Sequence, residues 1–380
     1  MSEFVFSPKP IRIDSGSGVH LQAESGTEYL DMGASYACTP LGHSHPAVVE
    51  ALTDQAERLT YVQGSYPVAV REELYDLVTE TAPDPIDHGW LANSGTEANE
   101  AAIKFARHAT GRSKILATKG AFHGRTLGSL AATWKPKYRD GFEPVAGGFD
   151  FVTFDDPAEL REAVDEETAG VIVEPIQGEG GINPASDDFL QAVREATEAV
   201  GAAMIVDEIQ SGLGRTGSLW AIEEAGVVPD IITSAKGLAN GLPIGATLVR
   251  EWIAEDAGNH GSTFSGGPAI AAASKATLET IREEDLPGHA ADLGAEFQTA
   301  LEAAVGDAAG VKAVRGEGLM VGIQVKRGAN GVVRDLAMDH QILALPAGRT
   351  VVRFLPPLIV EDDHVERTVE AVADVLGDQA

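Results

Sequence analysis

The sequence predicts an α/β fold whose core is a mainly parallel sheet with helices on both faces. In the middle of the chain, short apolar runs alternate with stretches whose apolar residues recur at helical spacing. Strands that alternate with helices in this way are typical of parallel sheets. The expected strands are residues 114–118, 151–154, 170–174 and 203–207, and the expected helices between them are residues 96–108, 157–165 and 187–200.

The two ends of the chain have a different pattern, in which strands and helices are fewer and more mixed. We predict that residues 1–50 and 285–380 together form a small α+β domain, which flanks a large α/β domain at residues 51–284. The expected elements of the small domain are a strand at residues 29–32, a helix at about 288–304, strands at 320–325 and 351–354, and a final helix from about residue 361.

The charge balance excludes two classes of partner. The chain has 58 acidic and 28 basic residues, which gives a formal net charge of −30. Such a surface repels nucleic acid and anionic membranes. Because the acidic residues are spread along the whole chain, we favour adaptation to high salt, where screening weakens this self-repulsion, over a role in handling acidic substrates.

Cysteine usage and hydropathy indicate a cytoplasmic protein. Cys38 is the single cysteine, so an intramolecular disulfide is impossible and no metal site built from cysteines is expected. The first residues lack the basic segment and long apolar run of a secretory signal. No apolar run approaches the ~20 residues that span a bilayer.

A phosphate cradle is one interpretation of the segment from Asn93 to Glu100. The segment opens a helical stretch, so the free N–H groups of a helix start lie beside the hydroxyl groups of Ser94 and Thr96. Gly95 lets the backbone come close to a ligand. The alternative is an ordinary serine or threonine helix cap.

Two further segments place a reactive side chain next to a predicted strand. Asp207 ends a buried apolar run, where a carboxylate is costly unless it is paired, for example with a protonated ring nitrogen. Lys236 precedes a glycine-rich loop, and a partly buried lysine with a lowered pKa attacks aldehydes. The plainer alternatives are a turn cap for Asp207 and a solvated loop lysine for Lys236.

Two other motifs do not indicate a site. Residues 212–217 match the pattern G-x-G-x-x-G, but a dinucleotide-binding turn directly follows a strand and opens a helix. Here residues 208–211 intervene and the following segment is typical of a loop, so we reject nicotinamide binding. His43 and His45 have no cysteine or carboxylate at ligand spacing, which favours a structured turn over a metal site.

Seven motifs, in order along nearly the whole chain, resemble those of the class III aminotransferases of pyridoxal phosphate (PLP) fold type I. An ordered set of this size is highly specific, and it outweighs the plainer alternatives for the single segments. The motifs are NSGTEANEAAIKFAR at 93–107, FHGRT at 122–126, EPIQGEGG at 174–181, DEIQSGLGRTG at 207–217, AKGLANGLPIG at 235–245, STFSGGP at 262–268 and RFLPPLIV at 353–360.

The resemblance implies which residues hold the cofactor, pyridoxal phosphate. Lys236 would bind it as a Schiff base and shuttle the proton, and Asp207 would pair with the pyridine nitrogen. The other implied cofactor-binding residues are Ser94, Gly95 and Thr96 at the phosphate, Phe122 and its neighbour His123 at the ring, Gln210 at the phenolic oxygen, and Thr263 at the phosphate in the neighbouring subunit.

The resemblance also implies how substrates are recognised. Arg353 would bind the α-carboxylate of glutamate as a bidentate fork. Glu179 would close over Arg353 for the terminal-amine substrate and move away for glutamate or 2-oxoglutarate. Arg125 would be a second carboxylate contact, Tyr36 would contact the substrate, and Ser262 would reach across an obligatory homodimer interface.

Within the class, the sequence most resembles the ω-aminotransferases of arginine and lysine biosynthesis that act on ornithine or lysine carried on LysW, a small acidic carrier protein. Segments 36–42, 134–139 and 345–348 favour this group. The expected reaction moves the terminal amino group between the carrier-protected substrate and 2-oxoglutarate by a ping-pong mechanism. N-acetylornithine aminotransferase is the first alternative, and free ornithine is the next, because Tyr36 resembles a tyrosine of ornithine aminotransferases.

Two rival functions are compatible with the same fold. A PLP aminomutase of the glutamate-1-semialdehyde type is disfavoured by the intact Glu179 and Arg353. A catalytically inactive PLP-binding regulatory protein could dispense with Lys236, Arg125 or Arg353, and all three are present. The acidic carrier poses a separate problem, because a chain of net charge −30 would repel it unless high salt or a local basic rim near residues 135–139 offsets the repulsion.

Overall fold

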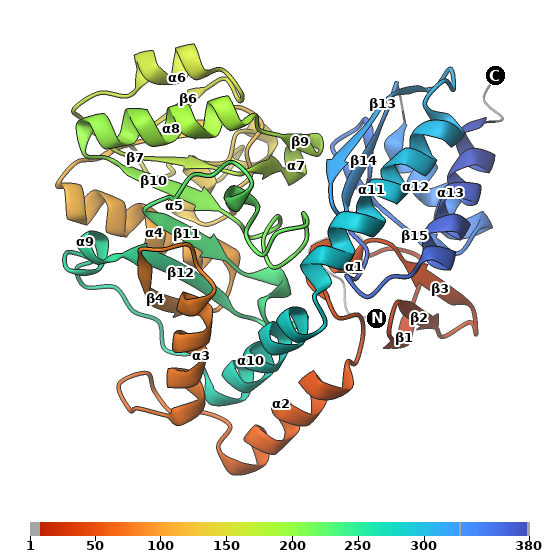
Figure 1. The fold of residues 1–380 in the computed structure, drawn as a ribbon, viewed down its shortest axis with the longest axis horizontal. Helices are drawn as coiled ribbons and strands as arrows, with labels where there is room; N and C mark the ends of the chain where they lie inside the picture. Colours follow the sequence, from red (N-terminus) through yellow and green to blue (C-terminus); the bar gives the residue numbers. More distant parts are fainter. Residues whose placement is uncertain (1–7, 327, 378–380) are drawn as a thin grey trace.

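The computed structural model describes residues 8–326 and 328–377, and its largest element is a seven-stranded sheet (Figure 1). All strands of this sheet run in one direction except β12, which is antiparallel to both of its neighbours. The predicted α/β fold with a mainly parallel sheet is therefore confirmed. In spatial order the strands are β4 (Ile86–Ala92), β12 (Gly245–Arg250), β11 (Ile231–Ser234), β10 (Ala203–Asp207), β7 (Thr168–Val173), β5 (Lys114–Thr118) and β6 (Phe149–Val152).

The alternation of side chains along β10 explains why both faces of the sheet carry helices. Ala203 and Ile205 join an apolar cluster with helix α4, whereas Met204 and Val206 join a second cluster with helix α8. Because neighbouring strand residues point to opposite faces, a continuous apolar run needs a cover on both sides. The helices of this part of the chain are α2 (Pro46–Arg58), α3 (Ala69–Glu80), α4 (Gly95–Thr110), α5 (Leu127–Ala131), α6 (Pro157–Ala163), α8 (Asp187–Val200), α9 (Glu251–Ala254) and α10 (Pro268–Glu283).

Several predicted elements match the structure closely. Strands β5 and β10 and helix α8 have the predicted ends, and α4 and α6 differ from prediction by two residues or fewer at each end. Strand β6 lies two residues earlier than predicted. No element is predicted from the sequence at strands β4, β11 and β12 or at helices α2, α3 and α10, although apolar residues of α3 such as Val70, Leu74 and Leu77 recur at helical spacing.

Both ends of the chain contribute to two smaller sheets beside the central one (Figure 1). Strand β15 pairs in parallel with β3, so that Ile342 lies opposite Leu30. The elements are β1 (Ile13–Ser17), β2 (His20–Ala23), β3 (Glu28–Asp31) and β15 (Ile342–Leu343) in one sheet, and β13 (Val311–Glu317), β14 (Met320–Val325), β17 (Val351–Phe354) and β16 (Leu345–Ala347) in the other, with helices α1 (Ala34–Ala37), α11 (Leu286–Val305), α12 (Ala329–Asp339) and α13 (Asp362–Gly377).

The domain limits at residues 51 and 284 stay a prediction. Helix α2 begins at Pro46 and packs on α10, so this helix crosses the first limit. Residues 1–7, part of the segment that was judged to lack a secretory signal, lie outside the described residues. None of the helices in the described ranges combines the length and apolar character needed to cross a membrane.

The remaining short elements lie near the carboxyl ends of the central strands. They include a two-stranded ribbon and four-residue or shorter helical turns, and they carry two of the predicted site residues, Glu179 and Lys236. These elements are β8 (Ile176–Gln177), α7 (Gly178–Gly181), β9 (Asn183–Pro184), and the 3-10 turns η1 (Pro136–Tyr138), η2 (Ala221–Glu223) and η3 (Lys236–Ala239).

Candidate active site

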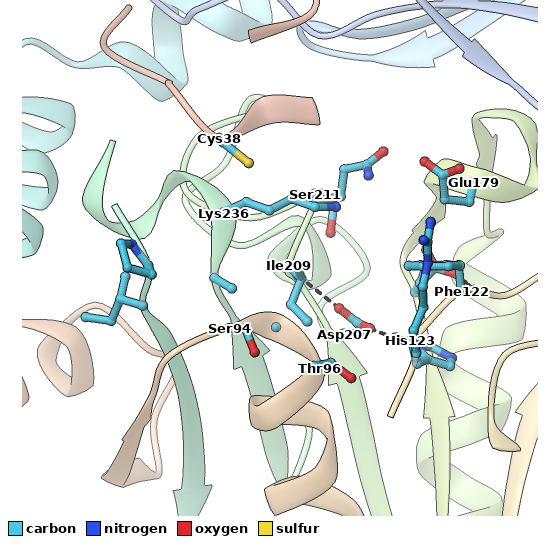
Figure 2. Close-up of a pocket in the computed structure, with 18 of the residues that line it drawn as sticks. Cys38, Ser94, Thr96, Phe122, His123, Glu179, Asp207, Ile209, Ser211 and Lys236 are labelled. Carbon is cyan, nitrogen blue, oxygen red and sulfur yellow. Dashed lines mark hydrogen bonds and ion pairs between the residues drawn. The ribbon is translucent and has the colours of Figure 1, made fainter. Parts of the chain in front are cut away.

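A cavity of about 500 Å³ lies at the carboxyl ends of the central strands (Figure 2). It is lined by the segments that follow β4, β5, β7, β10 and β11, which is where open α/β sheets bind ligands. The structure therefore brings together residues that are far apart in the sequence. The predicted site residues that line the cavity are Ser94, Gly95, Thr96, Phe122, His123, Arg125, Glu179, Asp207, Gln210 and Lys236.

Asp207 lies at the base of the cavity and is almost fully buried. Its Oδ2 atom is 2.7 Å from His123 Nδ1 and accepts a hydrogen bond of 2.7 Å from Asn99 Nδ2, and its Oδ1 atom accepts one of 3.0 Å from the backbone N–H of Ile209. Burial alone would lower the pKa of His123, but the hydrogen bond and charge of Asp207 and the charge of Glu174 raise it. The pair thus places a well-oriented negative charge beside the cavity.

Lys236 approaches the cavity from the side opposite Phe122 and Glu179 (Figure 2). It opens η3 with φ of 42°, a left-handed conformation that is unfavourable for a residue with a side chain. Burial lowers the pKa of its amine. The amine has no hydrogen-bond or ion-pair partner among the described residues, and a lysine with a lowered pKa is a better nucleophile than an ordinary one.

The start of helix α4 forms another wall of the cavity. The backbone N–H groups of Gly95 and Thr96 lie in the first turn, where no intrahelical acceptor exists. A Cβ atom at Gly95 would lie 2.7 Å from Ile209 Cδ1, so only glycine fits there without a shift. Ser94 Oγ accepts a 3.3 Å hydrogen bond from Glu97 N, so the helix cap and the anion cradle are properties of the same segment.

A buried ion pair stands at the edge of the cavity. Arg353 is fully buried, and its Nη2 atom is 2.8 Å from Glu179 Oε1. Arg353 Nη1 donates a 2.9 Å hydrogen bond to Gln210 Oε1, and the guanidinium carbon lies 5.3 Å from the centroid of the Tyr36 ring. The exposed Tyr36 and the less exposed Glu179 thus lie between this arginine and solvent.

An aromatic and a basic side chain form the wall of the cavity opposite Lys236. The rings of Phe122 and Tyr138 meet edge to face with centroids 5.2 Å apart, and the guanidinium carbon of Arg125 is 5.2 Å from the Tyr138 centroid. Behind them, Glu174 accepts a 3.1 Å hydrogen bond from the backbone N–H of Phe122. Burial raises the pKa of Glu174 to about 7.

Ser262 and Thr263 do not line the cavity. They lie in a separate depression with residues 61–66. Ser262 Oγ accepts a 2.8 Å hydrogen bond from Nδ2 of Asn93, which does line the cavity, so one side chain connects the two depressions.

Comparison with known proteins identifies the family. The class-III aminotransferase family matches residues 6–376. The chain belongs to the class-III aminotransferases. It is 40% identical over 369 residues to a LysW-aminoadipate semialdehyde/glutamate semialdehyde transaminase of Sulfurisphaera tokodaii, covering 97% of this chain and 95% of the relative. It is 42% identical over 375 residues to an acetylornithine aminotransferase of Methanopyrus kandleri, covering 98% and 95%.

Solved structures agree with this assignment. The ornithine aminotransferase of Toxoplasma gondii has a TM-score of 0.94 and 32% identity to this chain, covering 99% of this chain and 92% of that one. The protein is a PLP-dependent aminotransferase, and the predicted family, fold type and cofactor are confirmed.

The cavity of this aminotransferase fits pyridoxal phosphate on three observations. The free N–H groups of Gly95 and Thr96 suit a phosphate, the buried carboxylate of Asp207 suits a protonated ring nitrogen, and the unpartnered amine of Lys236 suits an aldehyde. In addition, His123 Nε2 is buried and has no partner among the described residues. The site is therefore built for a ligand that supplies the missing partners.

Sequence reasoning missed three residues that shape the aminotransferase site. Asn99 is fully buried on α4 and binds Asp207, Glu174 binds the Phe122 loop, and Cys38 lies above Lys236 in the cavity wall (Figure 2). A polar residue on the apolar face of a predicted helix could have indicated Asn99, and Glu174 stands in a quoted motif. Nothing in the sequence pattern places Cys38 there.

The two motifs that were set aside are structural. Residues 212–217 form turns after β10 and open no helix, as predicted. His43 Nε2 lies 2.8 Å from Asp31 Oδ2, so a carboxylate twelve residues away does accompany the histidine. That bond ties the β3 end to the following turn.

Proposed function

We propose that this aminotransferase moves the terminal amino group between LysW-linked ornithine or lysine and 2-oxoglutarate or glutamate, in arginine or lysine biosynthesis. The observation that carries the proposal is the buried Arg353–Glu179 pair at the edge of the cavity that contains Lys236. A cation that a neighbouring carboxylate can cover or release lets one site accept two different substrates in turn. Relatives named for LysW-linked substrates support the choice of substrate.

Bound pyridoxal phosphate supplies an aldehyde that combines with amines and a ring that takes up electron density. Lys236 would hold the aldehyde covalently. It would then move the proton between the substrate carbon that carries the amine and C4′ of the cofactor, because its lowered pKa leaves the lysine amine able to accept the proton. Asp207, fixed by His123 and Asn99, would keep the ring nitrogen protonated. Glu179 would hold Arg353 closed in the terminal-amine half-reaction.

The remaining cofactor contacts follow from the same geometry. The first turn of α4, with Ser94, Gly95 and Thr96, would bind the phosphate. Phe122 would stack on the ring and Gln210 would contact its phenolic oxygen.

The homodimer is part of the proposal. Ser262 and Thr263 would contribute to the neighbouring subunit's site, because they lie outside this chain's own cavity but are joined to it through Asn93. Tyr61 and Phe264, next to them, have exposed rings 5.4 Å apart, as expected for a surface that a second copy covers.

A local cluster of cations supports docking of an acidic carrier. Lys135, Lys137 and Arg139 lie on and around η1, and Arg125 packs against the adjoining Tyr138. In a chain of net charge −30, such a cluster beside the cavity offsets the repulsion of an acidic partner. The exposed Tyr36 would contact the substrate at the same entrance.

N-acetylornithine is the second candidate substrate, because a relative 42% identical to this chain is named an acetylornithine aminotransferase. Comparison of kcat/KM for LysW-linked ornithine, LysW-linked lysine, N-acetylornithine and free ornithine decides between the candidates. The proposal expects a carrier-linked substrate to be preferred by at least about tenfold. Equal or higher kcat/KM for N-acetylornithine would overturn the carrier assignment and keep the aminotransferase.

Substitution of Arg353 tests the dual-substrate site. Arg353→Ala should raise KM for glutamate by about 100-fold, because a desolvated charge pair is lost. The KM for the terminal-amine substrate should change much less. An equal rise for both substrates would contradict the assignment.

We also propose that the acidic surface is an adaptation to high salt. Self-repulsion of the carboxylates destabilises the compact state at low ionic strength, and salt screens it. The unfolding temperature should therefore rise as potassium chloride is raised from millimolar to molar concentration, whereas an unchanged temperature would contradict the proposal.

A further inference from the structure

The Arg353–Glu179 pair creates an electrostatic problem whenever it opens. Arg353 is fully buried and Glu179 is its ion-pair partner, with 2.8 Å between Nη2 and Oε1. When a substrate carboxylate takes the guanidinium, the carboxylate of Glu179 loses this partner in a largely desolvated place. An unpaired carboxylate there is costly, so the open state needs a second cation.

Lys135 lies where that second cation is needed. It stands just before η1, is half-buried, and its Nζ atom donates a short hydrogen bond to the backbone carbonyl of Glu179 itself. A Cβ atom at Gly348 would lie 3.8 Å from Nζ, so the ammonium also lies against the turn between β16 and β17, the hairpin that carries Arg353. Lys135 therefore lies beside the segments that carry both members of the pair.

The ammonium of Lys135 has unused donors. It offers three N–H bonds, and the Glu179 carbonyl is its one hydrogen-bond acceptor among the described residues. Burial lowers the pKa of Lys135, and the charge of Glu179 opposes this effect. A poorly solvated cation with free donors gains from the arrival of a carboxylate.

The reach of Glu179 permits the exchange without backbone movement. Nζ is bonded to the carbonyl oxygen of the residue whose carboxylate must move, so we expect rotation about the side-chain torsions of Glu179 to turn the carboxylate from Arg353 toward Lys135. The other cations near the cavity are less suited. Lys236 faces the cofactor position, and Arg125 is packed against Tyr138.

We propose that Lys135 is a positioning residue for substrate exchange: it receives the carboxylate of Glu179 when Arg353 binds the carboxylate of glutamate or 2-oxoglutarate. This inference rests on the proposed roles of Arg353 and Glu179. It adds Lys135 as a third residue to the pair. In the open state Glu179 pairs with Lys135, and the substrate carboxylate pairs with Arg353. The closed state then has one ion pair, Glu179 with Arg353, and the open state has two, so the carboxylate of Glu179 has a cationic partner in both.

The test measures binding of glutarate, a dicarboxylate with neither amine nor keto group, to the PLP-loaded enzyme by titration calorimetry. Lys135→Met should raise the dissociation constant by about tenfold, as expected for a partly desolvated ion pair. Lys135→Arg should stay close to the unaltered enzyme. Lys312→Met, which removes a lysine remote from the cavity on β13, controls for the change in net charge and should have no effect.

A double-substitution cycle separates this role from a structural one. In a Glu179→Ala background there is no carboxylate to receive, so Lys135→Met should not change glutarate binding further. In the unaltered background, Lys135→Met should raise KM for glutamate while KM for free ornithine, a terminal-amine substrate that needs no carrier docking, stays the same. An unchanged dissociation constant in Lys135→Met, or an equal rise in both backgrounds, would overturn the inference.

The two proposals fail differently. If Arg353→Ala binds glutarate as tightly as the unaltered enzyme, the dual-substrate assignment is wrong. If Arg353→Ala loses glutarate binding but the cycle shows no coupling between positions 135 and 179, only the role of Lys135 is wrong.

Discussion

Two buried aspartates at opposite ends of neighbouring central strands show how this protein separates stability from function. Asp230, just before β11, is surrounded by protein donors: Arg194 Nη1 at 2.8 Å, the backbone N–H of Met204 at 2.9 Å and Trp252 Nε1 at 3.2 Å. Arg250 Nε adds an ion pair at 3.6 Å. Asp207, at the end of β10, is equally buried but faces a cavity.

The surroundings of Asp207 are incomplete by comparison. Lys236 has no polar partner within the described residues, and both His123 Nε2 and Arg353 Nε are buried without one. A buried charge that lacks a partner costs stability, so such groups persist where a ligand completes them. Arg194 Nε, beside Asp230, is also buried without a partner, so the active site is marked by unpartnered groups that face a cavity and not by missing partners alone.

The largest effect is expected for Lys236→Ala. Turnover should fall by at least about 10³-fold, because both the covalent attachment and the proton transfer are lost. The visible absorbance of the lysine-linked cofactor should disappear as well. The unfolding free energy of the cofactor-free protein should not fall, since the removed amine has no partner. Retention of the visible band would show that another residue holds the cofactor.

Asp230→Ala should lower stability and leave turnover unchanged. Removing a carboxylate that several donors share should lower the free energy of unfolding by about 3 kcal/mol, measured by urea titration. The kcat of the molecules that remain folded should not change, because the residue is remote from the cavity. A fall in kcat with unchanged stability would abolish the distinction between the two aspartates.

Asp207→Asn keeps the shape of the side chain and removes its charge. We expect kcat to fall by about 100-fold, as when one preorganised electrostatic contact is lost. Cofactor dissociation, followed by dialysis, should also be faster. The loss of unfolding free energy should be smaller than for Asp230→Ala, and a larger loss would mean that Asp207 is chiefly structural.

The smallest effect concerns Glu208, the residue next to Asp207. Its carboxylate accepts a 2.8 Å hydrogen bond from the backbone N–H of Ile222, and burial raises its pKa to about 7. A carboxyl group whose pKa is raised on folding favours the folded state while protonated, and this stabilisation is lost as pH rises toward that pKa. Between pH 5 and pH 8 the free energy of unfolding should therefore fall by roughly 2 kcal/mol more in the unaltered protein than in Glu208→Gln.

The measurement for Glu208 is urea unfolding of the cofactor-free protein at both pH values. The variant and the unaltered protein should differ more at pH 8 than at pH 5. A constant difference would show that Glu208 is ionised at both pH values.

Much of the fold was predictable because the central strands alternate with helices. The run at 203–207 and the helix at 187–200 match the structure at both ends, since a continuous apolar run and a clear helical period leave little ambiguity. The antiparallel strand β12 was not predictable, because its apolar run resembles that of a parallel strand. Its direction depends on its pairing with β4 and β11.

The site was only partly predictable for a related reason. Lys236, Asp207 and the start of α4 stand in ordered motifs that identify the family. Asn99, Glu174 and Lys135 act through contacts with residues 108, 52 and 44 positions away in the chain. No local sequence pattern predicts contacts between residues so far apart in the chain.

The order of residue types along the chain was enough to predict the family, the cofactor and the residues expected to bind the cofactor, because motifs are properties of the sequence. The pairing of buried charges followed only from the fold, because it depends on distances between segments that are far apart in the chain. In the folded chain Asp207 faces a cavity, Asp230 faces protein donors, and Lys135 lies beside Glu179.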